Sequence, residues 1–452
     1  MVRIFNHYIS LRVLMLTGIE AAVLFASILI GLELRLIEPL PPIALLHAAL
    51  FSVAMLTSMS ALGLYESFVA PLSATVSRLL IAFVLSCTAI LLAFGMLPTI
   101  PVGRGLMAWS ALLGLTSLLL VRLICFYLTD LGLPKRRVLV LGNGSEAEQV
   151  ISQLNAGGLK GAVQYVGLYP VSPEQERRFD HEQMLRTAAE LKVTEMVVAV
   201  KERRGGVLPL RQLLDAKLRG IHVVDLHSFY EREQGILRLD SMRASWMIFG
   251  DGFAQSPWRA LVKRCFDLLV SASLLVLTLP VLVIAMAAIA WDSPGGIFYR
   301  QERVGEAGRR FWIRKLRTMR SDAEADGRPQ WAGVNDPRIT RIGAFLRKSR
   351  IDELPQLWNV LCGEMSFVGP RPERPFFVEA LTERIPFYQV RHSIRPGITG
   401  WSQVRYPYGA SESDALNKLQ YDLYYVKNHS LFLDLLILVE TIQVVLMGRG
   451  AR

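Results

Sequence analysis

Cysteine and charge are both scarce in this chain, and each shortage excludes a class of protein. The four cysteines among 452 residues are scattered, and no two stand at the spacing of metal ligands. Neither a zinc site nor a disulfide framework is therefore expected. Charged residues make up 20% of the chain and hydrophobic residues 52%, a balance too apolar for intrinsic disorder. Acidic residues are fewer than basic ones, 39 against 50, so the chain is basic as well as apolar, which favours a membrane protein. The length of 452 residues is that of a multidomain chain.

Long uncharged runs occupy the first part of the chain. They cover residues 13–32, 43–64, 79–97 and 106–128. Each is close to the ~20 residues that a helix needs to cross the hydrocarbon core of a bilayer. Their only Asp, Glu, Lys or Arg residues are Glu20 in the first run and Arg122 in the fourth. We therefore predict a membrane protein with an N-terminal bundle of four transmembrane helices within residues 1–133.

Basic residues flank this predicted bundle at both ends. Arg3 and Arg12 precede the first run, and Lys135, Arg136 and Arg137 follow the fourth. An even number of helices places both clusters on one side of the membrane, and the positive-inside rule makes that side cytoplasmic. The regions that follow the fourth helix are therefore expected at the cytoplasmic face.

Residues 134–255 have the pattern of a soluble α/β domain. The run RRVLVLGNG is typical of a buried strand followed by a glycine turn, and further strands are expected at 196–200 and 221–224. Strands that alternate with helical stretches predict a parallel, Rossmann-like sheet. The segment GNGSEA (142–147) is similar to a dinucleotide-binding fingerprint. An isolated motif of this kind is weak, so a structural or regulatory domain and a ligand-binding domain both stay open.

A fifth apolar run, residues 268–291, has a proline at its middle. Pro280 removes a backbone hydrogen bond and breaks the helical ladder there. Both flanks are rich in basic residues, from Arg259 before the run to Arg300 and Arg303 after it, so both ends are expected in the cytoplasm. The pattern predicts a re-entrant membrane hairpin bent at Pro280, and an ordinary kinked transmembrane helix is the alternative.

Residues 256–452 form the third predicted domain. The segment 263–350 holds most of the positive charge, with 16 Lys and Arg against 8 Asp and Glu. Anionic lipid head groups and phosphate-bearing substrates are the expected partners of such a segment beside a membrane, in preference to nucleic acid. The last apolar run, 431–447, contains Asp434 and Glu440, which favours a helix that lies in the interface or packs on the domain.

Two adjacent carboxylates, Asp352 and Glu353, stand near the start of a predicted helix. Pro355 is tolerated only in the first turn of a helix, and Gly363 is expected to end it. The apolar positions expected on one buried face are Leu354, Leu357, Trp358 and Leu361. A carboxylate beside bound phosphate is a candidate nucleophile, and two carboxylates can hold Mg²⁺. The alternative is a plain N-cap at Asp352, with Glu353 as a partner of the helix dipole.

Basic residues surround this pair in the sequence. Arg347, Lys348 and Arg350 precede it, and Arg371 follows in the tetrapeptide GPRP (369–372). The two prolines stiffen the backbone on either side of Arg371, and a rigidly presented guanidinium suits bidentate binding of phosphate. The alternative for Arg371 is a surface arginine in a tight turn.

The residues from about 260 to 452 resemble the polyprenyl-phosphate hexose-1-phosphate transferases, bacterial sugar transferases that start exopolysaccharide and O-antigen repeat units. The matching motifs, in order, are KRCFD (263–267), GGIFYRQERVG (295–305), KLRTM (315–319), DPRITRIGAFLRKSRIDELPQLWNVLCGEMSFVGPRPE (336–373) and RPGITGWSQV (395–404). The four predicted helices with an α/β insert are similar to the architecture of the large members of this family.

The resemblance implies a reaction in which sugar-1-phosphate passes from a UDP-sugar to undecaprenyl phosphate, with release of UMP. It assigns Asp352 as the nucleophile that forms a covalent phosphosugar intermediate. It gives Glu353 an auxiliary role in binding Mg²⁺ or handling a proton, so that both carboxylates are candidate metal ligands. The positions it implies beside the phosphates are Arg347, Arg371, Lys315 and Arg317.

The resemblance also bears on the membrane segment and the partners. The family's hairpin bends at a proline that Pro280 matches, although many members have Ser-Pro where this chain has Leu279-Pro280. Glucose and galactose are the common donors in the family, with N-acetylated sugars as the alternative. A homodimer and a location in the bacterial inner membrane, with the catalytic domain on the cytoplasmic face, are likewise implied.

Two other functions are alternatives to this one. A membrane-anchored, NAD-dependent nucleotide-sugar dehydratase would need a Tyr-x-x-x-Lys pair, but none of the 13 tyrosines has Lys four residues later. The strand-like VGLYPV (166–171) also ends without the acidic residue that would bind the cofactor ribose. A non-catalytic scaffold for polysaccharide assembly is disfavoured by the intact Asp-Glu pair and its arginines.

Overall fold

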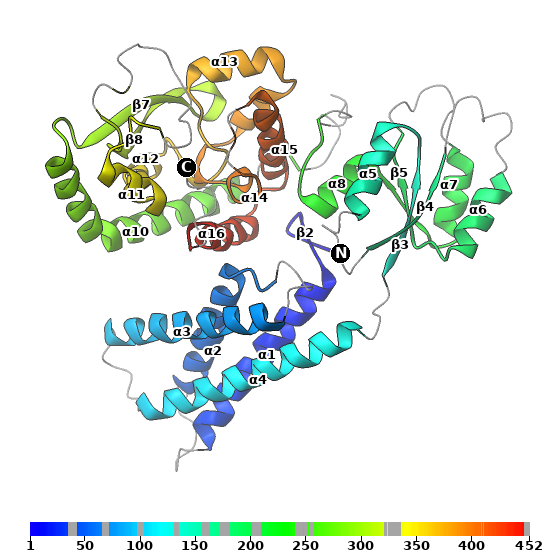
Figure 1. Ribbon diagram of the computed structural model, residues 1–452, viewed down its shortest axis with the longest axis horizontal. Coiled ribbons are helices and arrows are strands. Elements are labelled where there is room, and N and C mark those ends of the chain that lie inside the picture. Colours follow the sequence, from blue (N-terminus) through cyan, green and yellow to red (C-terminus); the bar gives the residue numbers. More distant parts are fainter. Residues whose placement is uncertain are drawn as a thin grey trace. The chain divides into compact units, whose positions relative to one another are not determined.

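The computed structural model divides the chain into two compact units (Figure 1). The first contains residues 9–233 together with 1–2, and the second contains residues 234–452 together with 3–8. The structure describes residues 1–34, 43–65, 72–96, 104–130, 135–155, 163–170, 181–200, 209–239, 247, 252–253, 256–320, 323, 336–407, 409 and 411–446.

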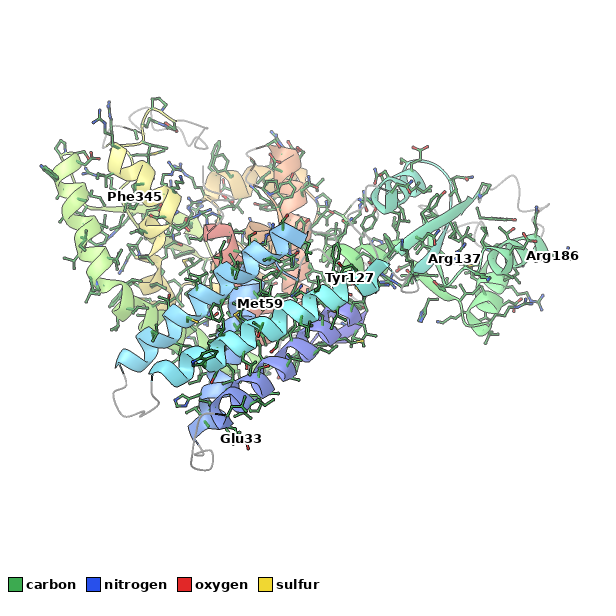
Figure 2. The ribbon with its side chains drawn as sticks, turned by 60° about the horizontal axis from the view of Figure 1, so that its bottom comes forward. Glu33, Met59, Tyr127, Arg137, Arg186 and Phe345 are labelled. Atoms are coloured by element: carbon green, nitrogen blue, oxygen red, sulfur yellow. The ribbon has the colours of Figure 1, made fainter. Side chains whose placement is uncertain are left out.

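Four long apolar helices begin the first unit. They are α1 (Leu11–Glu33), α2 (Ile43–Ala61), α3 (Leu72–Met96) and α4 (Arg104–Asp130). Helix α1 packs along α4 and α2, and α2 packs against α3 (Figure 1, Figure 2). Leu24, Met55 and Leu118 are fully buried between them. Each helix contains a stretch that is long and apolar enough to cross a membrane, which confirms the predicted apolar helices near the N-terminus.

Glu20 of α1 and Arg122 of α4 bind each other. Arg122 Nε lies 2.5 Å from Glu20 Oε1, and the Tyr65 hydroxyl donates to Glu20 Oε2 at 2.6 Å. Arg122 also donates to the Leu64 carbonyl at 3.1 Å. A lone charge at the centre of a bilayer helix costs about 2.5–3.5 kcal/mol or more, so pairing them across α1 and α4 removes a large penalty.

A four-stranded parallel sheet with flanking helices follows. The strands are β3 (Arg136–Leu141), β4 (Val163–Tyr169), β5 (Glu195–Val198) and β6 (His222–Asp225), in the order β4-β3-β5-β6. The helices are α5 (Ser145–Asn155), α6 (His181–Glu190), α7 (Leu210–Leu218) and α8 (Leu226–Gln234). This confirms the predicted α/β region with a parallel sheet. Gly142 has φ of 151°, and a Cβ there would lie 2.2 Å from the Ala199 carbonyl, so the glycine turn is needed for close packing of two strand ends.

The second unit is a mixed α/β domain. Its strands are β7 (Phe298–Val304) and β8 (Arg310–Leu316), which are antiparallel, and β9 (Ser366–Val368) and β10 (Gly397–Thr399), which are parallel. Its helices are α10 (Pro257–Asp292), α11 (Arg341–Ser349), α12 (Gln356–Cys362), α13 (Pro375–Arg384), α14 (Trp401–Arg405), α15 (Glu412–Asn428) and α16 (Leu431–Leu446). Short 3₁₀ turns are η2 (Glu306–Gly308), η3 (Ile351–Glu353) and η4 (Tyr388–Ser393). The predicted terminal helix at 431–447 is α16, and its Asp434 is buried against the Tyr425 hydroxyl.

Residues 3–8, near the start of the chain, belong to this second unit. The strands β1 (Val2–Ile4) and β2 (His7–Ile9) form a small hairpin. His7 Nδ1 lies 2.8 Å from the Tyr424 hydroxyl, and its ring meets Trp401 edge-on. Trp401 in turn donates to the Gly235 carbonyl at 2.7 Å. The N-terminus therefore contributes to the core around α14 and α15.

Helix α10 contacts the second unit with both of its halves. Near its start, Arg264 donates to the Val360 and Leu361 carbonyls at the end of α12, at 2.6 and 2.9 Å. Near its end, Leu282 and Ile289 pack in a cluster with residues of β8 and α11. Pro280 lies inside the helix, and Figure 1 shows α10 changing direction partway along. Both halves of α10 therefore contact other elements of the same unit.

Candidate active site

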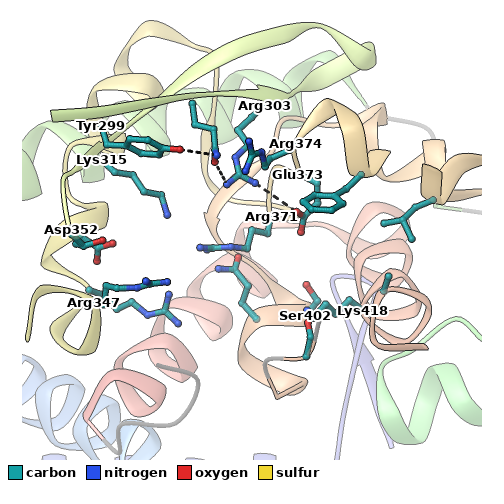
Figure 3. A pocket seen from close by; sticks show the side chains of 18 of the residues that line it. Tyr299, Arg303, Lys315, Arg347, Asp352, Arg371, Glu373, Arg374, Ser402 and Lys418 are labelled. Carbon is teal, nitrogen blue, oxygen red and sulfur yellow. Dashed lines mark hydrogen bonds and ion pairs between the residues drawn. The ribbon is translucent and has the colours of Figure 1, made fainter. Parts of the chain in front are cut away.

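A pocket of about 380 Å³ lies within the second unit, among the β7–β8 hairpin, the η3 turn and helices α11, α13, α14 and α15. Its basic lining residues are Arg303, Lys315, Arg317, Arg320, Arg347, Arg350, Arg371, Arg374, Arg391 and Lys418. The acidic ones in the described part of the chain are Asp352, Glu373 and Asp422. Figure 3 shows Asp352 and Arg347 on one side, Lys418 and Ser402 on the other, and Arg371 between them. This excess of cations suits a ligand with several negative charges, such as a diphosphate.

Asp352 lies in the η3 turn between α11 and α12. Arg350, which precedes the turn, has a left-handed backbone with φ of 60°, a conformation that costs a non-glycine residue about 1–3 kcal/mol. The Asp352 side chain lines the pocket, is 7% exposed, and has no hydrogen-bond donor to Oδ1 among the described residues. The alternative of a plain N-cap at Asp352 is wrong, because α12 begins at Gln356 and its N-cap is Pro355, whereas the 3₁₀ turn that holds Asp352 lies just before the helix, near the predicted start. The carboxylate is therefore held at the pocket without a structural hydrogen bond to Oδ1.

Helix α12 fixes the position of this turn. Gly363 ends the helix with φ of 86°, as predicted. The predicted buried face is rotated, since Trp358 is 47% exposed. The side-chain amide of Asn359 explains the rotation, because it donates to the Trp312 carbonyl at 2.8 Å and accepts from the Arg314 amide at 3.2 Å. Two hydrogen bonds to β8 thus orient α12.

Glu353 binds two cations that line the pocket. Its Oε1 accepts from Lys315 Nζ at 2.8 Å and from Arg371 Nη2 at 2.7 Å, and Arg350 Nη1 lies 3.7 Å away. Glu353 itself is not among the residues that line the pocket. The two adjacent carboxylates therefore have different surroundings, one bonded to cations and one facing the cavity.

These surroundings move the two pKa values in opposite directions. Burial raises the pKa of Asp352, and the neighbouring Glu353 charge raises it further against the opposing charge of Lys315. Burial alone would also raise the pKa of Glu353, but Arg371 and Lys315 outweigh it and hold that pKa well below its usual range. Opposed shifts in adjacent carboxylates are typical of a pair with divided roles.

The remaining predicted phosphate ligands differ in placement. Arg347, in the last turn of α11, lines the pocket, and its Nη1 is buried without a hydrogen-bond acceptor among the described residues. Arg317 borders the pocket, but its Nη1 and Nη2 donate to the Pro294 and Ser293 carbonyls, both at 2.6 Å. This placement favours a role in fixing the chain that leaves α10, rather than the predicted role beside phosphate.

The backbone beside Arg371 is positioned by a close contact between Gly369 and Gly397. A Cβ on Gly369 would lie 2.4 Å from the Arg395 carbonyl, and one on Gly397 would lie 2.1 Å from the Gly369 amide. Only glycine allows this contact between the segments after β9 and before β10. Arg391 then donates to the Arg371 carbonyl at 2.8 Å. The backbone of the GPRP segment is thereby held at both ends.

Sequence reasoning missed the far wall of the pocket. Arg391 in η4 and Lys418 and Asp422 in α15 all line it. They lie outside the residues from which the site was predicted, so no motif pointed to them. A helical pattern over α15 was the available signal, since Asp422 shares a face with the buried Leu419 and Leu423.

The residues present can be tested for their fit to Mg²⁺. The described residues contain no group of three or more His, Cys, Asp or Glu that could hold a metal ion. Mg²⁺ commonly uses one or two carboxylates and takes its other ligands from substrate phosphates and water. Asp352 fits that pattern with its unbonded oxygen, whereas Oε1 of Glu353 is already bonded to Lys315 and Arg371.

Comparison with known proteins agrees with the motifs. The family described as "Bacterial sugar transferase" matches residues 258–448. The chain is 31% identical over 350 residues to the UDP-glucose:undecaprenyl-phosphate glucose-1-phosphate transferase of Escherichia coli (strain K12), over 74% of each chain. This chain belongs to the bacterial sugar transferase family. The family match covers α10 to α16, so the pocket lies in the sugar transferase domain.

Two further relatives of the sugar transferase domain extend the comparison. The chain is 40% identical over 242 residues to the UDP-N-acetylgalactosamine-undecaprenyl-phosphate N-acetylgalactosaminephosphotransferase of Aeromonas hydrophila. It is 32% identical over 329 residues to the undecaprenyl-phosphate glucose phosphotransferase of Komagataeibacter xylinus. These alignments cover 54% and 70% of this chain, and it spans only 56% and 60% of those two relatives.

The two carboxylates should differ in their effect on stability. Glu353→Gln removes the counter-charge of Lys315 and Arg371, which should lower the free energy of unfolding by about 3 kcal/mol, as for a broken buried ion pair. Asp352→Asn should leave stability equal or raise it, because burial opposes ionisation of this carboxyl. Thermal unfolding of both variants in detergent at neutral pH measures the difference. The reverse order of stability would contradict this assignment of roles.

Proposed function

We propose that this chain transfers sugar-1-phosphate from a UDP-sugar to undecaprenyl phosphate, releasing UMP and starting the assembly of a polysaccharide. The observation that carries the proposal is the buried carboxylate of Asp352, unbonded at Oδ1, in a pocket whose charged lining residues are mostly cations. The relatives named above use UDP-sugars or undecaprenyl phosphate by name and support the same substrates.

In the first step, a carboxylate oxygen of Asp352 attacks the phosphorus that carries the sugar. A new bond forms between this oxygen and phosphorus, and the bond from phosphorus to the oxygen shared with UMP breaks. UMP leaves with that electron pair. Lys315, Arg347 and Arg371 lie where their charges can neutralise the diphosphate and the departing UMP. No proton transfer is required to activate an ionised carboxylate.

In the second step, a phosphate oxygen of undecaprenyl phosphate attacks the same phosphorus. The bond to Asp352 breaks, the carboxylate is restored, and a lipid-linked diphosphate sugar leaves. The same cations serve both steps, because each step places charge on oxygens of one phosphoryl group. Mg²⁺, held by Asp352 and the phosphates of the substrates, would supply further neutralisation of that charge.

Glu353 acts in this proposal through its neighbours. It holds Lys315 and Arg371 at the pocket wall, and its negative charge raises the pKa of Asp352. A more basic carboxylate is the better nucleophile as long as it is ionised at neutral pH. Glu353 is thus a positioning residue.

We further propose that α10 is a re-entrant membrane hairpin and that the sugar transferase domain lies on the cytoplasmic face of the inner membrane. Both halves of α10 contact one domain, which a helix spanning the membrane from that domain could not do. Trp258 and Trp291, near its two ends, are 70% and 92% exposed, and tryptophan favours the lipid–water interface. The apolar middle of α10 is exposed as well, as at Val276.

Asp352→Asn should lower donor-dependent UMP release by roughly 10³-fold or more, as for loss of a covalent nucleophile. Asp292→Asn, an exposed carboxylate at the end of α10, is the matched control and should leave the rate unchanged. The pH profile gives a second readout. Because the pKa of Asp352 is raised, the wild-type rate should fall as the pH drops through a value above that of an ordinary aspartate.

Normal turnover of Asp352→Asn would contradict the proposed nucleophile. If the wild-type protein forms no lipid-linked product with Mg²⁺ and a panel of UDP-sugars, the scaffold function replaces the transferase.

Cysteine labelling tests the topology of α10. Two proteins are needed, each without the other cysteines: one carries Ser256→Cys before α10, and the other keeps the native, exposed Cys362 after it. Each should react with an impermeant maleimide only in permeabilised cells. Glu33→Cys, at the far end of α1, is the control and should react in intact cells. Labelling of either Ser256→Cys or Cys362 from outside would show that α10 crosses the membrane.

A further inference from the structure

The wall of the pocket opposite Asp352 contains a buried carboxylate that is only partly bonded. Asp422, on α15, is 1% exposed and lines the pocket. Its Oδ2 accepts from Arg391 Nη2 at 2.8 Å. Its Oδ1 is buried and has no hydrogen bond of normal geometry among the described residues, and the Ser402 hydroxyl, also in the pocket wall, is a neighbouring group of this chain that acts on the carboxylate. Arg391 neutralises the charge and fixes the carboxylate, which leaves one strong acceptor oxygen available to a ligand.

A second acceptor lies on the neighbouring helix α14. The side chain of Gln403 lines the pocket, and its Nε2 donates to the Ile398 carbonyl at 3.2 Å. That bond fixes the amide orientation and leaves Oε1 buried without a donor among the described residues. Buried polar atoms in proteins are almost always hydrogen-bonded, so two such acceptors on one pocket wall indicate a ligand that brings donors.

Cations line both sides of the pocket, and the far side adds the acceptors of Asp422 and Gln403. The side around Asp352 presents ammonium and guanidinium groups, which bind phosphate oxygens. Phosphate oxygens carry no protons to donate at neutral pH, so they cannot satisfy Asp422 and Gln403. A hydroxyl group can donate to each of them. A nucleotide sugar carries such hydroxyls on its hexose and on its ribose.

We propose that Asp422 and Gln403 bind hydroxyl groups of the donor and make transfer depend on their presence. The proposal rests on the proposed function and adds two specificity-determining residues to it. A site that hydrogen-bonds a substrate hydroxyl rejects the analogue that lacks it, because the buried acceptor is then left without a donor. A charged acceptor such as Asp422 gives the stronger discrimination of the two.

The test compares donors with their deoxy analogues on wild-type protein and two variants. In Asp422→Asn, the side-chain oxygen keeps the bond from Arg391, so an NH₂ group replaces the free acceptor at nearly the same size. Gln403→Met removes the second acceptor and leaves the pair of Asp422 and Arg391 intact. Asp434→Asn is the control, since Asp434 is also buried and paired with a cation, Lys263, but does not line the pocket.

Two sets of analogues separate the sources of the hydroxyl groups. One set lacks single hydroxyls on the ribose of the UDP-sugar, and the other lacks single hydroxyls on the hexose. The ratio of kcat/KM between each donor and its analogue should be about 10- to 100-fold for the hydroxyl that Asp422 binds, as for a hydrogen bond to a charged group. This ratio should shrink to within about threefold in Asp422→Asn and stay at the wild-type value in Asp434→Asn.

The outcomes separate this proposal from the proposed function. If the variants lose the kcat/KM ratio only for deoxyribose analogues, Asp422 and Gln403 bind the ribose. If they lose it only for deoxyhexose analogues, the two residues bind the hexose. Binding of the same compounds can be measured by calorimetry without any transfer reaction. It therefore shows whether Asp422 and Gln403 bind donor hydroxyls even if no UDP-sugar is turned over. If both variants keep the wild-type ratios for every analogue, the two residues do not bind donor hydroxyls. Gln403→Met alone decides the question if Asp422→Asn does not fold.

Discussion

The pocket depends on one arrangement of charge, in which neighbouring carboxylates are divided between two tasks. Glu353 is bonded to Lys315 and Arg371, so its charge holds the cations that a phosphate ligand needs. Asp352 is left buried at the pocket surface with Oδ1 unbonded. If Asp352 were bonded to these cations instead, its pKa would fall and it would be a weaker nucleophile. The opposed pKa shifts of the pair are therefore the electrostatic basis of the proposed covalent step.

Contacts elsewhere in the second unit hold these charged residues in position. Asn359 fixes α12 on β8, and Arg264 ties the start of α10 to the end of α12. Gly369 allows the close backbone contact from which Arg371 projects. Arg317, predicted beside the phosphates, borders the pocket but uses its terminal nitrogens to bind backbone carbonyls at the end of α10. A basic residue in a motif need not be a phosphate ligand.

Much of the architecture could be predicted from the sequence, because it depends on local patterns. Hydrophobic length marks the first four helices, alternation marks the parallel sheet, and Gly363 marks the end of a helix. Contacts between distant segments have no such signal. The pairing of Glu20 with Arg122, the rotation that exposes Trp358 and the pairing of Asp422 with Arg391 all depend on which elements pack together. The sequence predicts Asp352 and Glu353 as site residues, but their different bonding partners depend on the three-dimensional structure.

The central claim is that the carboxylate of Asp352 carries the sugar phosphate between two substrates. Intact-mass measurement of protein quenched after mixing with UDP-sugar, in the absence of lipid acceptor, tests it directly. The account predicts a mass increase equal to one sugar phosphate, localised to the peptide that contains Asp352, missing in Asp352→Asn and discharged by undecaprenyl phosphate. Unmodified protein under these conditions, together with UMP release that strictly requires the lipid, would show direct transfer and contradict the account.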